Sequence, residues 1–543
     1  MHASLPRPTG LTLAQVVAET ALHSPARPAI LFGGRAISYA ELTNRVNEAA
    51  LALLASGVVR GDRVGVLLGN TPEWVVLALA SAAVGATCVP LNTWYRSGEL
   101  RWNIAHCGLK LLISSARFLK TDYVSLLTEL IPELGGAEIG QLNSNQFPTL
   151  QSVIFVGDDI PQRLFGWDSF LARASASYMS DLSAASQAVT EQDIAFILYT
   201  SGSTAEPKGV MLNHRGLVAN GFELGARRGI VNEDRVWLGS PLFYALGATN
   251  ALPATFTRGA TLVLQGHFDA RSAIEVIEST KATVFYGTGN MAQAILDHPE
   301  YRQSRIGTLQ KGNAGTMTTY KRLTLLEMGI SGAVPAYGLT ETYGNATVGY
   351  PDDPLETKLE TCGVPLANME MQIVNPSSGT ELPRGEVGLV LIRGHTTPGY
   401  FANALETGKV LRPDGFFDTG DLGSFDGDGR FHFHSRLKEV IKTGGINVSP
   451  AEVEQIITAH PAVRDAHVVG VVHPTRGELV VAIVDAKSSL AAEEVQAFVK
   501  ARAASFKVPH YVLFRHEDQL PRLASGKVAK YKLAEEAQRE LGL

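Results

Sequence analysis

Short apolar segments that alternate with amphipathic helical stretches constrain the fold of this chain more than any other feature. Residues 37–56, ISYAELTNRVNEAALALLAS, carry apolar residues at steps of three and four, which predicts a helix. The segment DRVGVLL at 62–68 is typical of a buried strand, and ATLVLQG, ATVFYGTG and AVPAYGLTE are further short strands that break into glycine or polar residues. This alternation predicts layered α/β sheets, in which ligands bind at the carboxyl ends of the strands.

The sequence pattern changes after about residue 355. From Met369 to Gly394, apolar and polar residues alternate with period two between turn signals, which indicates antiparallel strands. Beyond Ser435 the chain reads as a compact set of strands, a Gly-Gly loop and helices, with a typical helix start at Ser449 and Pro450. We therefore expect a β-rich subdomain after the layered sheets, and a further α+β unit at the C-terminus.

The length of the chain sets a lower bound on the number of domains. A chain of 543 residues is longer than one hydrophobic core supports, so at least two domains are expected. We predict a large N-terminal domain over residues 1–435 and a small C-terminal domain over residues 436–543. Residues 181–192, DLSAASQAVTEQ, are mostly small and polar, and we interpret them as a linker.

The composition narrows the class of protein. The formal net charge is −6, which gives no reason to expect a nucleic-acid partner. The widely spaced Cys88, Cys107 and Cys362 form neither a disulfide framework nor a zinc site, and they fit a reducing compartment. The first ten residues lack the apolar core of a signal peptide, so we predict a cytoplasmic location.

One apolar stretch, Trp74 to Leu91, carries no charge over about the length that a membrane span needs. Its interior is rich in small residues, Gly85 interrupts it and Pro90 ends it. We interpret it as a buried helix over Trp74–Val84 followed by a strand over Thr87–Pro90, and we expect no integral membrane segment.

The segment ILYTSGSTAEPKGVML, residues 197–212, gives the first sign of function. A strand that ends in small hydroxylated residues and glycine exposes successive backbone N–H groups, which form a concavity for anions. Lys208 adds a cation for a phosphate held there, although the loop is not a Walker A sequence. A surface turn has the same composition when it stands alone. The residues of the predicted phosphate loop are Thr200, Ser201, Gly202, Ser203, Thr204 and Lys208.

Four more motifs follow in order, namely YGLTET at 337–342, FFDTGDLG at 416–423, SRLKEVIKTGG at 435–445 and LPRLASGKV at 520–528. Together with the loop they resemble the adenylate-forming (ANL) superfamily of acyl-CoA synthetases, nonribosomal-peptide adenylation domains and firefly luciferase. The resemblance covers nearly the whole chain, from Ile37 to Lys527. It implies a large N-terminal domain and a small, mobile C-terminal domain.

The resemblance implies how ATP would bind. The phosphate loop and Lys208 would hold the β- and γ-phosphates, and Tyr337 would lie near the adenine. Asp421 would bind both ribose hydroxyls, and Arg436 would also reach the ribose. The other nucleotide-binding positions that it implies are Asn313, Ala314 and Gly338.

The resemblance also implies the catalytic groups. Thr340 would contact the α-phosphate, Glu341 would hold Mg²⁺, and Lys527 would be the catalytic lysine. Because two negative groups must meet, cations placed where charge develops supply most of the catalysis. The C-terminal domain would then rotate about Lys438, and the loop at Gly444 and Gly445 would form the tunnel for the pantetheine of CoA.

The acyl pocket of similar enzymes corresponds here to residues 240–250, 285–291 and 311–316. Domains that activate amino acids place an Asp in the first segment, and none stands there in this chain, so a buried ammonium would have no partner. We expect an apolar carboxylic acid, either medium- to long-chain or bulky cyclic or aromatic. Several glycines favour a roomy pocket. The residues expected to line the pocket are Phe243, Tyr244, Gly247, Phe285, Gly287, Met291 and Gly312.

The expected reaction is therefore formation of an acyl-adenylate from ATP, with release of pyrophosphate, and then transfer of the acyl group to CoA. An acyl-AMP ligase that loads an acyl carrier protein shares every adenylation residue and remains an alternative. No feature of the sequence requires a luciferase-like oxygenase. Retention of Glu341, Asp421 and Lys527 argues against a non-catalytic nucleotide-binding protein. The sequence does not decide the oligomeric state, and a homodimer is one of the states left open.

Overall fold

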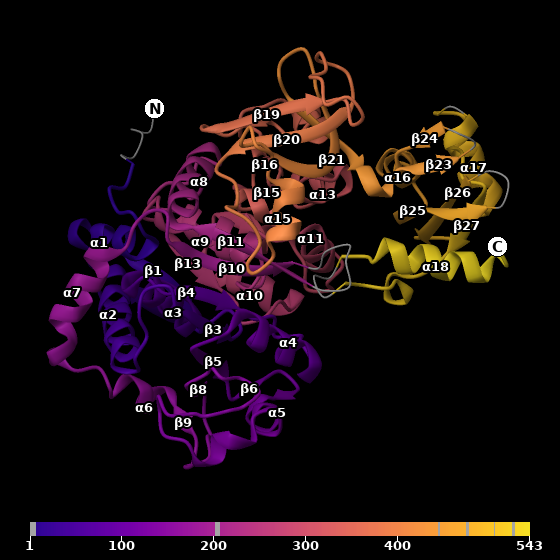
Figure 1. Ribbon diagram of the computed structural model, residues 1–543. Coiled ribbons are helices and arrows are strands. Elements are labelled where there is room, and N and C mark those ends of the chain that lie inside the picture. Colours follow the sequence, from indigo (N-terminus) through magenta and orange to yellow (C-terminus); the bar gives the residue numbers. More distant parts are fainter. Residues whose placement is uncertain (1–6, 201–206, 444–445, 474–476, 504, 524–526) are drawn as a thin grey trace.

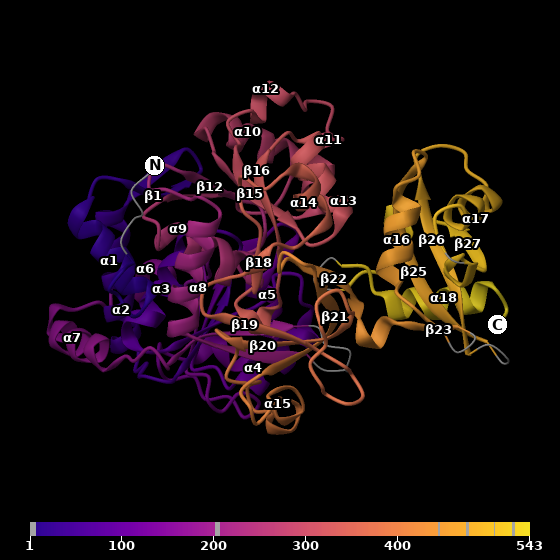
Figure 2. The same cartoon turned by 90° about the horizontal axis from the view of Figure 1, so that it is seen from above.

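The computed structural model describes residues 7–200, 207–443, 446–473, 477–503, 505–523 and 527–543. In these residues the chain forms two large sheets, a four-stranded sheet, a two-stranded ribbon and a further sheet near the C-terminus. Figures 1 and 2 show the C-terminal sheet and its helices, in yellow, as a body beside the rest of the chain. The expected mixed α/β fold with a small C-terminal α+β unit is confirmed.

One large sheet has seven strands and carries the predicted phosphate loop at an edge hairpin. Its order is β11 (Lys208–Asn213), β10 (Ile194–Thr200), β4 (Thr87–Pro90), β3 (Arg63–Leu67), β5 (Leu111–Ser115), β8 (Ser152–Val156) and β9 (Phe165–Gly166). Because β10 runs parallel to β4 and antiparallel to β11, the ends of β10 and β4 meet at one edge. Residues that follow β4 therefore lie beside the end of β10, at Thr200.

The second large sheet has nine strands and carries the YGLTET motif at the end of β16, together with the segments expected to form the acyl pocket. Its order is β18 (Val364–Pro365), β17 (Thr347–Val348), β16 (Gly332–Tyr337), β15 (Lys311–Gly315), β14 (Val284–Tyr286), β12 (Arg235–Leu238), β13 (Thr261–Leu264), β1 (Pro28–Phe32) and β2 (Arg35–Ser38). The strands from β16 to β13 are parallel, so their carboxyl ends share one edge. That edge is where ligands bind in open α/β sheets.

Three groups of helices cover the two sheets. One group shares a single core with both sheets and consists of α1 (Leu13–His23), α2 (Tyr39–Ala55), α3 (Pro72–Val84), α8 (His214–Arg227) and α9 (Leu252–Phe256). The nine-stranded sheet also packs against α10 (Ala270–Thr280), α11 (Gly289–Leu296) and α12 (Gln303–Ile306), and the seven-stranded sheet against α4 (Ser97–Cys107) and α5 (Tyr123–Leu130). Most of these helices bury apolar side chains on one face, whereas α3 and α9 are buried on all sides.

The uncharged stretch after residue 74 forms the buried helix and strand that the sequence predicts. The Thr71 side chain caps α3 by accepting from the Trp74 N–H group, and Pro72 occupies its first turn. Gly85 ends the helix at φ 74°, a conformation that glycine adopts without strain. All four residues of β4 are buried. Among the described residues no helix is long and apolar enough to cross a membrane.

The linker expected at residues 181–192 is wrong in its first two thirds. Residues Met179–Ala188 form helix α7, which packs against α2 and α3 and buries Leu182. Serine and glutamine are typical of a linker, but the alanines among them favour a helix. Packing against α2 and α3 supplies the burial that a short helix needs for stability.

The expected antiparallel strands form a four-stranded sheet of β19 (Met369–Val374), β20 (Gly388–Gly394), β21 (Phe417–Phe425) and β22 (Phe431–Arg436). The C-terminal sheet follows with β23 (Ile441–Thr443), β24 (Ile446–Val448), β25 (Val463–His473), β26 (Gly477–Ala486) and β27 (Tyr511–Phe514). Its helices are α16 (Pro450–Thr458), α17 (Ala492–Lys500) and α18 (Lys530–Glu540). Ser449 caps α16, as the sequence predicts, and its hydroxyl also donates to the His434 carbonyl at 2.9 Å.

Candidate active site

Asp421 lies at the centre of a group that three motifs bring together. It stands on β21 opposite Arg436 of β22, in register across the antiparallel pair. Its Oδ2 accepts a hydrogen bond from the Tyr337 hydroxyl at 2.7 Å, and its Oδ1 lies 3.0 Å from Nε of Arg436. Tyr337 ends the parallel strand β16, so the nine-stranded sheet and the four-stranded sheet meet at this carboxylate.

The Asp421 carboxylate is short of one hydrogen bond. The residue is 2% exposed, and in the described part of the chain its Oδ1 has no aligned donor, despite the proximity of Arg436. Burial raises the pKa of Asp421, while the charge of Arg436 opposes the rise. A buried acceptor without its hydrogen bond is costly, and such an atom is commonly completed by a ligand.

The Tyr337 ring is packed rather than open. The residue is 3% exposed, and its ring lies 4.7 Å from the Phe431 ring and 5.7 Å from the Phe433 ring between centroids. Burial, and then the charge of Asp421, raise the pKa of the Tyr337 hydroxyl well above its ordinary value. The phenol therefore stays neutral and acts as a donor that fixes the position of the Asp421 carboxylate.

Glu341 and Lys208 belong to a second group of residues, in which both contact Tyr400. Thr340 and Glu341 lie in the short 3₁₀ turn η5 (Thr340–Thr342), directly after β16. Oε1 of Glu341 accepts from the Tyr400 hydroxyl at 2.8 Å, and the Lys208 ammonium lies 5.1 Å above the Tyr400 ring. The predicted metal ligand and the predicted phosphate cation thus share one aromatic neighbour.

Lys208 is paired with a carboxylate that the sequence did not reveal. Its ammonium donates to Glu406 on α15 (Ala404–Val410), and Lys409 binds the same carboxylate. The hydrogen bonds from Lys208 and Lys409, in that order, lower the pKa of Glu406 to about 2. The pair holds Lys208 at the end of the hairpin where Thr200 and Lys208 stand opposite each other in register.

Lys527 lies within electrostatic reach of the Asp421 group, although it belongs to the C-terminal part of the chain. The Leu523 N–H group donates to the Lys527 carbonyl at 2.8 Å, which positions the backbone of Lys527. The residue as a whole is exposed, yet the groups that crowd its ammonium lower the pKa of Lys527 by desolvation. Repulsion by Arg436 adds to the lowering and attraction by Asp421 opposes it.

The C-terminal body also contacts the helix that follows β15 of the nine-stranded sheet. The pKa of Tyr320 on α13 (Thr318–Arg322) is raised to about 12, first by burial and then by the charge of Asp465 on β25. Helix α13 contacts helix α16, and β22 contacts α16 as well. The predicted pivot Lys438 is exposed in the 3₁₀ turn η6 (Leu437–Glu439) that connects the two parts.

Some predicted residues lie outside the described part of the chain. These are Ser201, Gly202, Ser203 and Thr204 of the phosphate loop, and Gly444 and Gly445 of the predicted tunnel. Their roles remain predictions.

Two of the residues predicted for the acyl pocket form an aromatic cluster with Trp94. The Phe243 ring lies 4.7 Å from the Tyr244 ring, and Trp94 approaches both, at 5.6 and 6.0 Å between centroids. Nδ2 of Asn92 donates to the Tyr244 hydroxyl at 3.0 Å. Asn92 and Trp94 follow β4, whose end lies beside that of β10. The Trp94 side chain is 51% exposed, so it presents apolar surface to solvent.

The predicted glycines do not leave the room that the sequence suggested. A Cβ atom at Gly287 would lie 2.4 Å from the Phe285 ring, at Gly247 2.6 Å from the Pro241 carbonyl, and at Gly312 2.3 Å from the Phe285 carbonyl. Phe285 is fully buried and stacks on Trp237 at 5.2 Å, so it belongs to the core behind the sheet. These glycines permit close approach of neighbouring groups, and the expectation of spare volume at their positions is not supported. Met291 lies half-buried in the first turn of α11.

Asn313 is held by a buried arginine. Its Oδ1 accepts from Arg228 at 3.2 Å and from the Gly315 N–H group at 3.3 Å. Arg228 is fully buried, donates to Asn250 at 3.1 Å and stacks over the Tyr286 ring at 4.5 Å. Ala314 is buried beside it, and Gly338 follows Tyr337, where a Cβ atom would meet the Asn345 backbone at 2.5 Å.

Sequence reasoning missed several neighbours of the site. Tyr400 and Glu406 lie between the family motifs, and only the segment PGYFANALE ahead of α15 marks their position. Trp94 and Asn92 follow an early strand, and nothing in their local sequence points to the site. The residues concerned are Asn92, Trp94, Arg228, Tyr400 and Glu406.

Comparison with known proteins adds to this geometry. The family model described as AMP-binding enzyme matches residues 17–401, and the model described as AMP-binding enzyme C-terminal domain matches residues 452–527. A putative acyl-CoA synthetase, YngI of Bacillus subtilis, is 32% identical over 532 residues, which cover 96% of this chain and 96% of that protein. The mitochondrial medium-chain acyl-CoA ligase ACSF2 of Homo sapiens is 31% identical, over 98% of this chain and 88% of that protein.

Solved structures resemble the chain over nearly its whole length. ATP-bound MatB from Rhodopseudomonas palustris has a TM-score of 0.81 and 26% identity, and the match covers 98% of this chain and 100% of that one. The anthranilate CoA ligase AuaEII in complex with anthranoyl-AMP has a TM-score of 0.84 over 99% of each chain. Its identity is 22%, so it supports the fold alone.

Proposed function

The chain belongs to the family of AMP-binding enzymes, and on that premise we propose that it is an AMP-forming acid–CoA ligase. The observation that carries the proposal is the buried Asp421 carboxylate, with Oδ2 fixed by Tyr337 and Oδ1 without an aligned donor. A ribose hydroxyl supplies the donor that this oxygen lacks. The curated relatives named acyl-CoA synthetase and acyl-CoA ligase support the choice of reaction.

In the proposed first step the carboxylate of the acid attacks the α-phosphorus of ATP, and pyrophosphate leaves with the electrons of the broken P–O bond. Asp421 and Arg436 hold the ribose, and Thr340 contacts the α-phosphate. Lys527 supplies a positive charge where the negative charge of the transition state develops. Lys208 and the phosphate loop at 200–204 hold the leaving phosphates.

Glu341 is the residue that would hold Mg²⁺. In the described part of the chain no group of three or more histidine, cysteine, aspartate or glutamate side chains converges. One carboxylate with substrate phosphates and water is a usual ligand set for Mg²⁺, so the single Glu341 fits. The ion, when bound, would neutralise phosphate charge. Tyr400 orients the carboxylate through its hydrogen bond to Oε1.

In the proposed second step the CoA thiol attacks the acyl carbonyl and AMP leaves. We propose that residues 436–543 rotate about Lys438 between the two steps, which moves Lys527 away and brings in the loop at Gly444 and Gly445. The exposed turn η6 and its position between the two parts support a hinge there. Glycines have no side chain, so the pair in this loop suits a narrow pantetheine tunnel.

The proposed substrate is an apolar carboxylic acid of medium or greater chain length, or a bulky cyclic or aromatic acid. No acidic residue lies between Ser240 and Asn250, so an ammonium group in the pocket would be unpaired. The cluster of Trp94, Phe243 and Tyr244 offers apolar and aromatic surface instead. The name of the relative ACSF2, a medium-chain acyl-CoA ligase, agrees with this class.

The test is product analysis over a panel of acids with ATP and Mg²⁺, with and without CoA. We expect acid-dependent release of pyrophosphate, and acyl-CoA and AMP in equal amounts when CoA is present. If CoA did not change the rate of pyrophosphate release, and a holo carrier protein discharged the adenylate, the acceptor of the acyl group would be the carrier protein and not CoA. ATP binding without pyrophosphate release for any acid in the panel would contradict the proposed function.

A further inference from the structure

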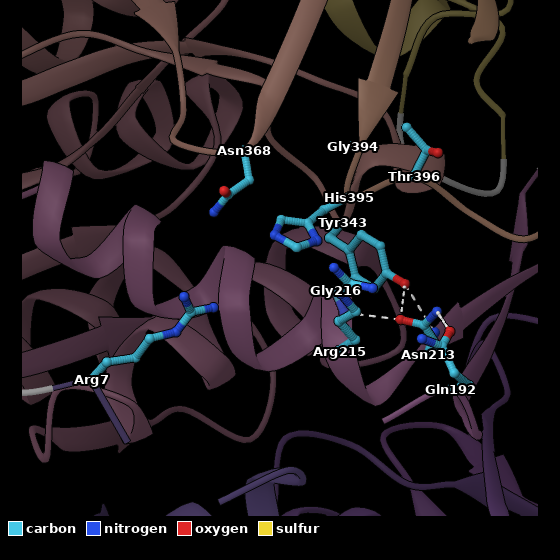
Figure 3. A pocket seen from close by; sticks show the side chains of 10 residues that line it. All are labelled: Arg7, Gln192, Asn213, Arg215, Gly216, Tyr343, Asn368, Gly394, His395 and Thr396. Carbon is cyan, nitrogen blue, oxygen red and sulfur yellow. Dashed lines mark hydrogen bonds between the residues drawn. The ribbon is translucent and has the colours of Figure 1, made fainter. Parts of the chain in front are cut away.

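A cavity of about 360 Å³ adjoins the turn that carries Glu341, but it is separate from the proposed nucleotide site. None of the described residues predicted to bind nucleotide or acid lines it. Its wall includes Tyr343, one residue beyond η5, and His395 at the end of β20. Figure 3 shows the imidazole of His395 between the side chains of Asn368 and Tyr343, with the guanidinium of Arg7 on the same side as Asn368.

The lining carries positive charge and no acidic residue. Arg7 and Arg215 supply that charge, and the other lining residues, among them the imidazole of His395, are polar or uncharged. Both arginines lower the pKa of His395, in addition to its burial, so both guanidinium groups lie within electrostatic reach of the imidazole. Glu191 is the acidic group that opposes them, and it lies 3.8 Å from Arg215 with a side chain that is 46% exposed.

Two further features suit an anion. Nε2 of His395 is buried and has no hydrogen-bond partner in the described part of the chain. The first turn of α8, a helix of 14 residues capped by Asn213, forms part of the wall through Asn213, Arg215 and Gly216. The N–H groups of His214, Arg215 and Gly216 already donate to the Asp193 carbonyl, the Glu191 carbonyl and Asn213 Oδ1. This helix end therefore adds partial positive charge to that of the arginines, but no free donor.

We propose that this cavity binds a small phosphate-bearing molecule. Two guanidinium groups and an imidazole are side chains that recognise phosphate oxygens, and the partial charge of the nearby helix end favours an anion. The volume lies within the range of about 300–1,000 Å³ that small-molecule sites occupy, so it has space for more than inorganic phosphate alone. The proposal is independent of the proposed function, because no residue of the catalytic reaction is part of it.

The cavity is tied to the catalytic turn by hydrogen bonds. The Tyr343 hydroxyl donates to Oδ1 of Asn213 at 2.8 Å and accepts from the Asn213 N–H group at 2.9 Å. The Thr397 N–H group, two residues after His395, donates to the Glu341 carbonyl at 2.7 Å. A bound phosphate would therefore touch the segments that hold the backbone of Glu341 in place.

The test follows the chemical shift of the His395 imidazole by NMR in the full-length protein with ¹³C-labelled histidine. The variant His395→Gln assigns the signal. Inorganic phosphate, pyrophosphate and AMP are titrated separately. We expect a saturable shift of the His395 signal and a higher His395 pKa with at least one of the three. The double variant Arg7→Gln/Arg215→Gln should raise the dissociation constant about tenfold or more, because it removes two charge-assisted partners.

The control variant is Arg35→Gln, which removes an exposed arginine from β2 and should leave the affinity unchanged. Circular dichroism checks the fold of each variant, and Arg7→Gln alone serves if the double variant does not fold. Absence of any His395 shift with all three probes would overturn the proposal. So would a shift that the arginine variants leave intact but Asp421→Asn abolishes, since that response would come from the nucleotide site.

Discussion

Tyr337 and Asp421 lie 84 residues apart in the sequence, and a hydrogen bond of 2.7 Å joins the phenol hydroxyl to Oδ2 of the carboxylate. Both residues are buried, and the other carboxylate oxygen is left without an aligned donor in the described part of the chain. One oxygen is thus used to hold the carboxylate, and the other is available to a substrate. This division explains why a motif on each of two sheets is needed to form the proposed ribose site.

Replacing Asp421 by Asn tests the ribose contact at nearly constant volume. We expect KM for ATP to rise about ten- to a hundredfold, because charge-assisted hydrogen bonds to the ribose are lost. Wild-type enzyme should prefer ATP to 2′-deoxy-ATP, and Asp421→Asn should lose that preference. Steady-state kinetics with both nucleotides measures it, and an unchanged preference would remove Asp421 from the ribose site.

Tyr400→Phe tests the positioning of Glu341. The ring beneath the Lys208 ammonium remains, while the hydroxyl that donates to Glu341 at 2.8 Å is lost. We expect the Mg²⁺ concentration for half-maximal adenylation to rise about tenfold, as for loss of other groups that orient a metal ligand. Tyr531→Phe, at a side chain that is 59% exposed, is the matched control and should have no effect. An equal response of both variants would show that Tyr400 has no specific role.

The pKa of Lys527 predicts the alkaline limit of adenylation. Desolvation and the charge of Arg436 lower this pKa below the ordinary 10.5, so the required ammonium is lost at a lower pH than for a free lysine. Activity should fall on the alkaline side through that lowered pKa. Arg436→Gln should move the fall to higher pH, because one of the two causes is removed. Profiles of kcat/KM against pH measure this, and a fall that moves to lower pH in Arg436→Gln would contradict it.

His214 predicts a pH dependence of stability away from the site. It is fully buried, both ring nitrogens lack partners in the described part of the chain, and burial lowers its pKa from 6.5 to about 4. Because the folded pKa is the lower one, the contribution to stability is present above pH 6.5 and is lost as the pH falls toward 4, by about 3 kcal/mol at the lower end.

Urea unfolding at several pH values measures that dependence. His214→Leu should flatten the loss of stability between pH 6.5 and 4, whereas His516→Leu, at an exposed histidine, should not. If the wild type and His214→Leu lose stability in parallel over this range, the buried histidine is not its source.

The sequence predicts elements well where local signals are strong. Gly85 marks the end of α3 and Ser449 the start of α16, because caps and helix-ending glycines act through neighbouring residues. The predicted start of α3, at Trp74, is two residues late, although Thr71 caps the helix and Pro72 begins it. Residues 181–192 misled because small polar residues allow both a linker and a packed helix. Burial of Leu182 against α2 and α3 decides between the two, and that contact is not visible in sequence.

The residues of the candidate site also fall into those that the sequence predicts and those that it does not. Asp421, Arg436 and Glu341 stand in motifs that resemble a known family, so their positions could be predicted. Trp94 reaches the site through strand order, since β4 and β10 are neighbours in space but more than a hundred residues apart in sequence. Tyr400 reaches it through a backbone bridge to Val210 of β11. The glycines expected to give room instead accommodate neighbouring backbone and rings, a difference that depends on three-dimensional packing.

In the proposed reaction a mixed anhydride between the acid and AMP precedes the thioester. One turnover with ATP, Mg²⁺, CoA and an acid whose carboxylate carries ¹⁸O in both oxygens, followed by mass spectrometry of the products, tests this order. We expect AMP with a single ¹⁸O atom, because the attacking carboxylate oxygen stays on the α-phosphorus when the thiol displaces AMP. Unlabelled AMP beside ¹⁸O-labelled pyrophosphate or phosphate would contradict it.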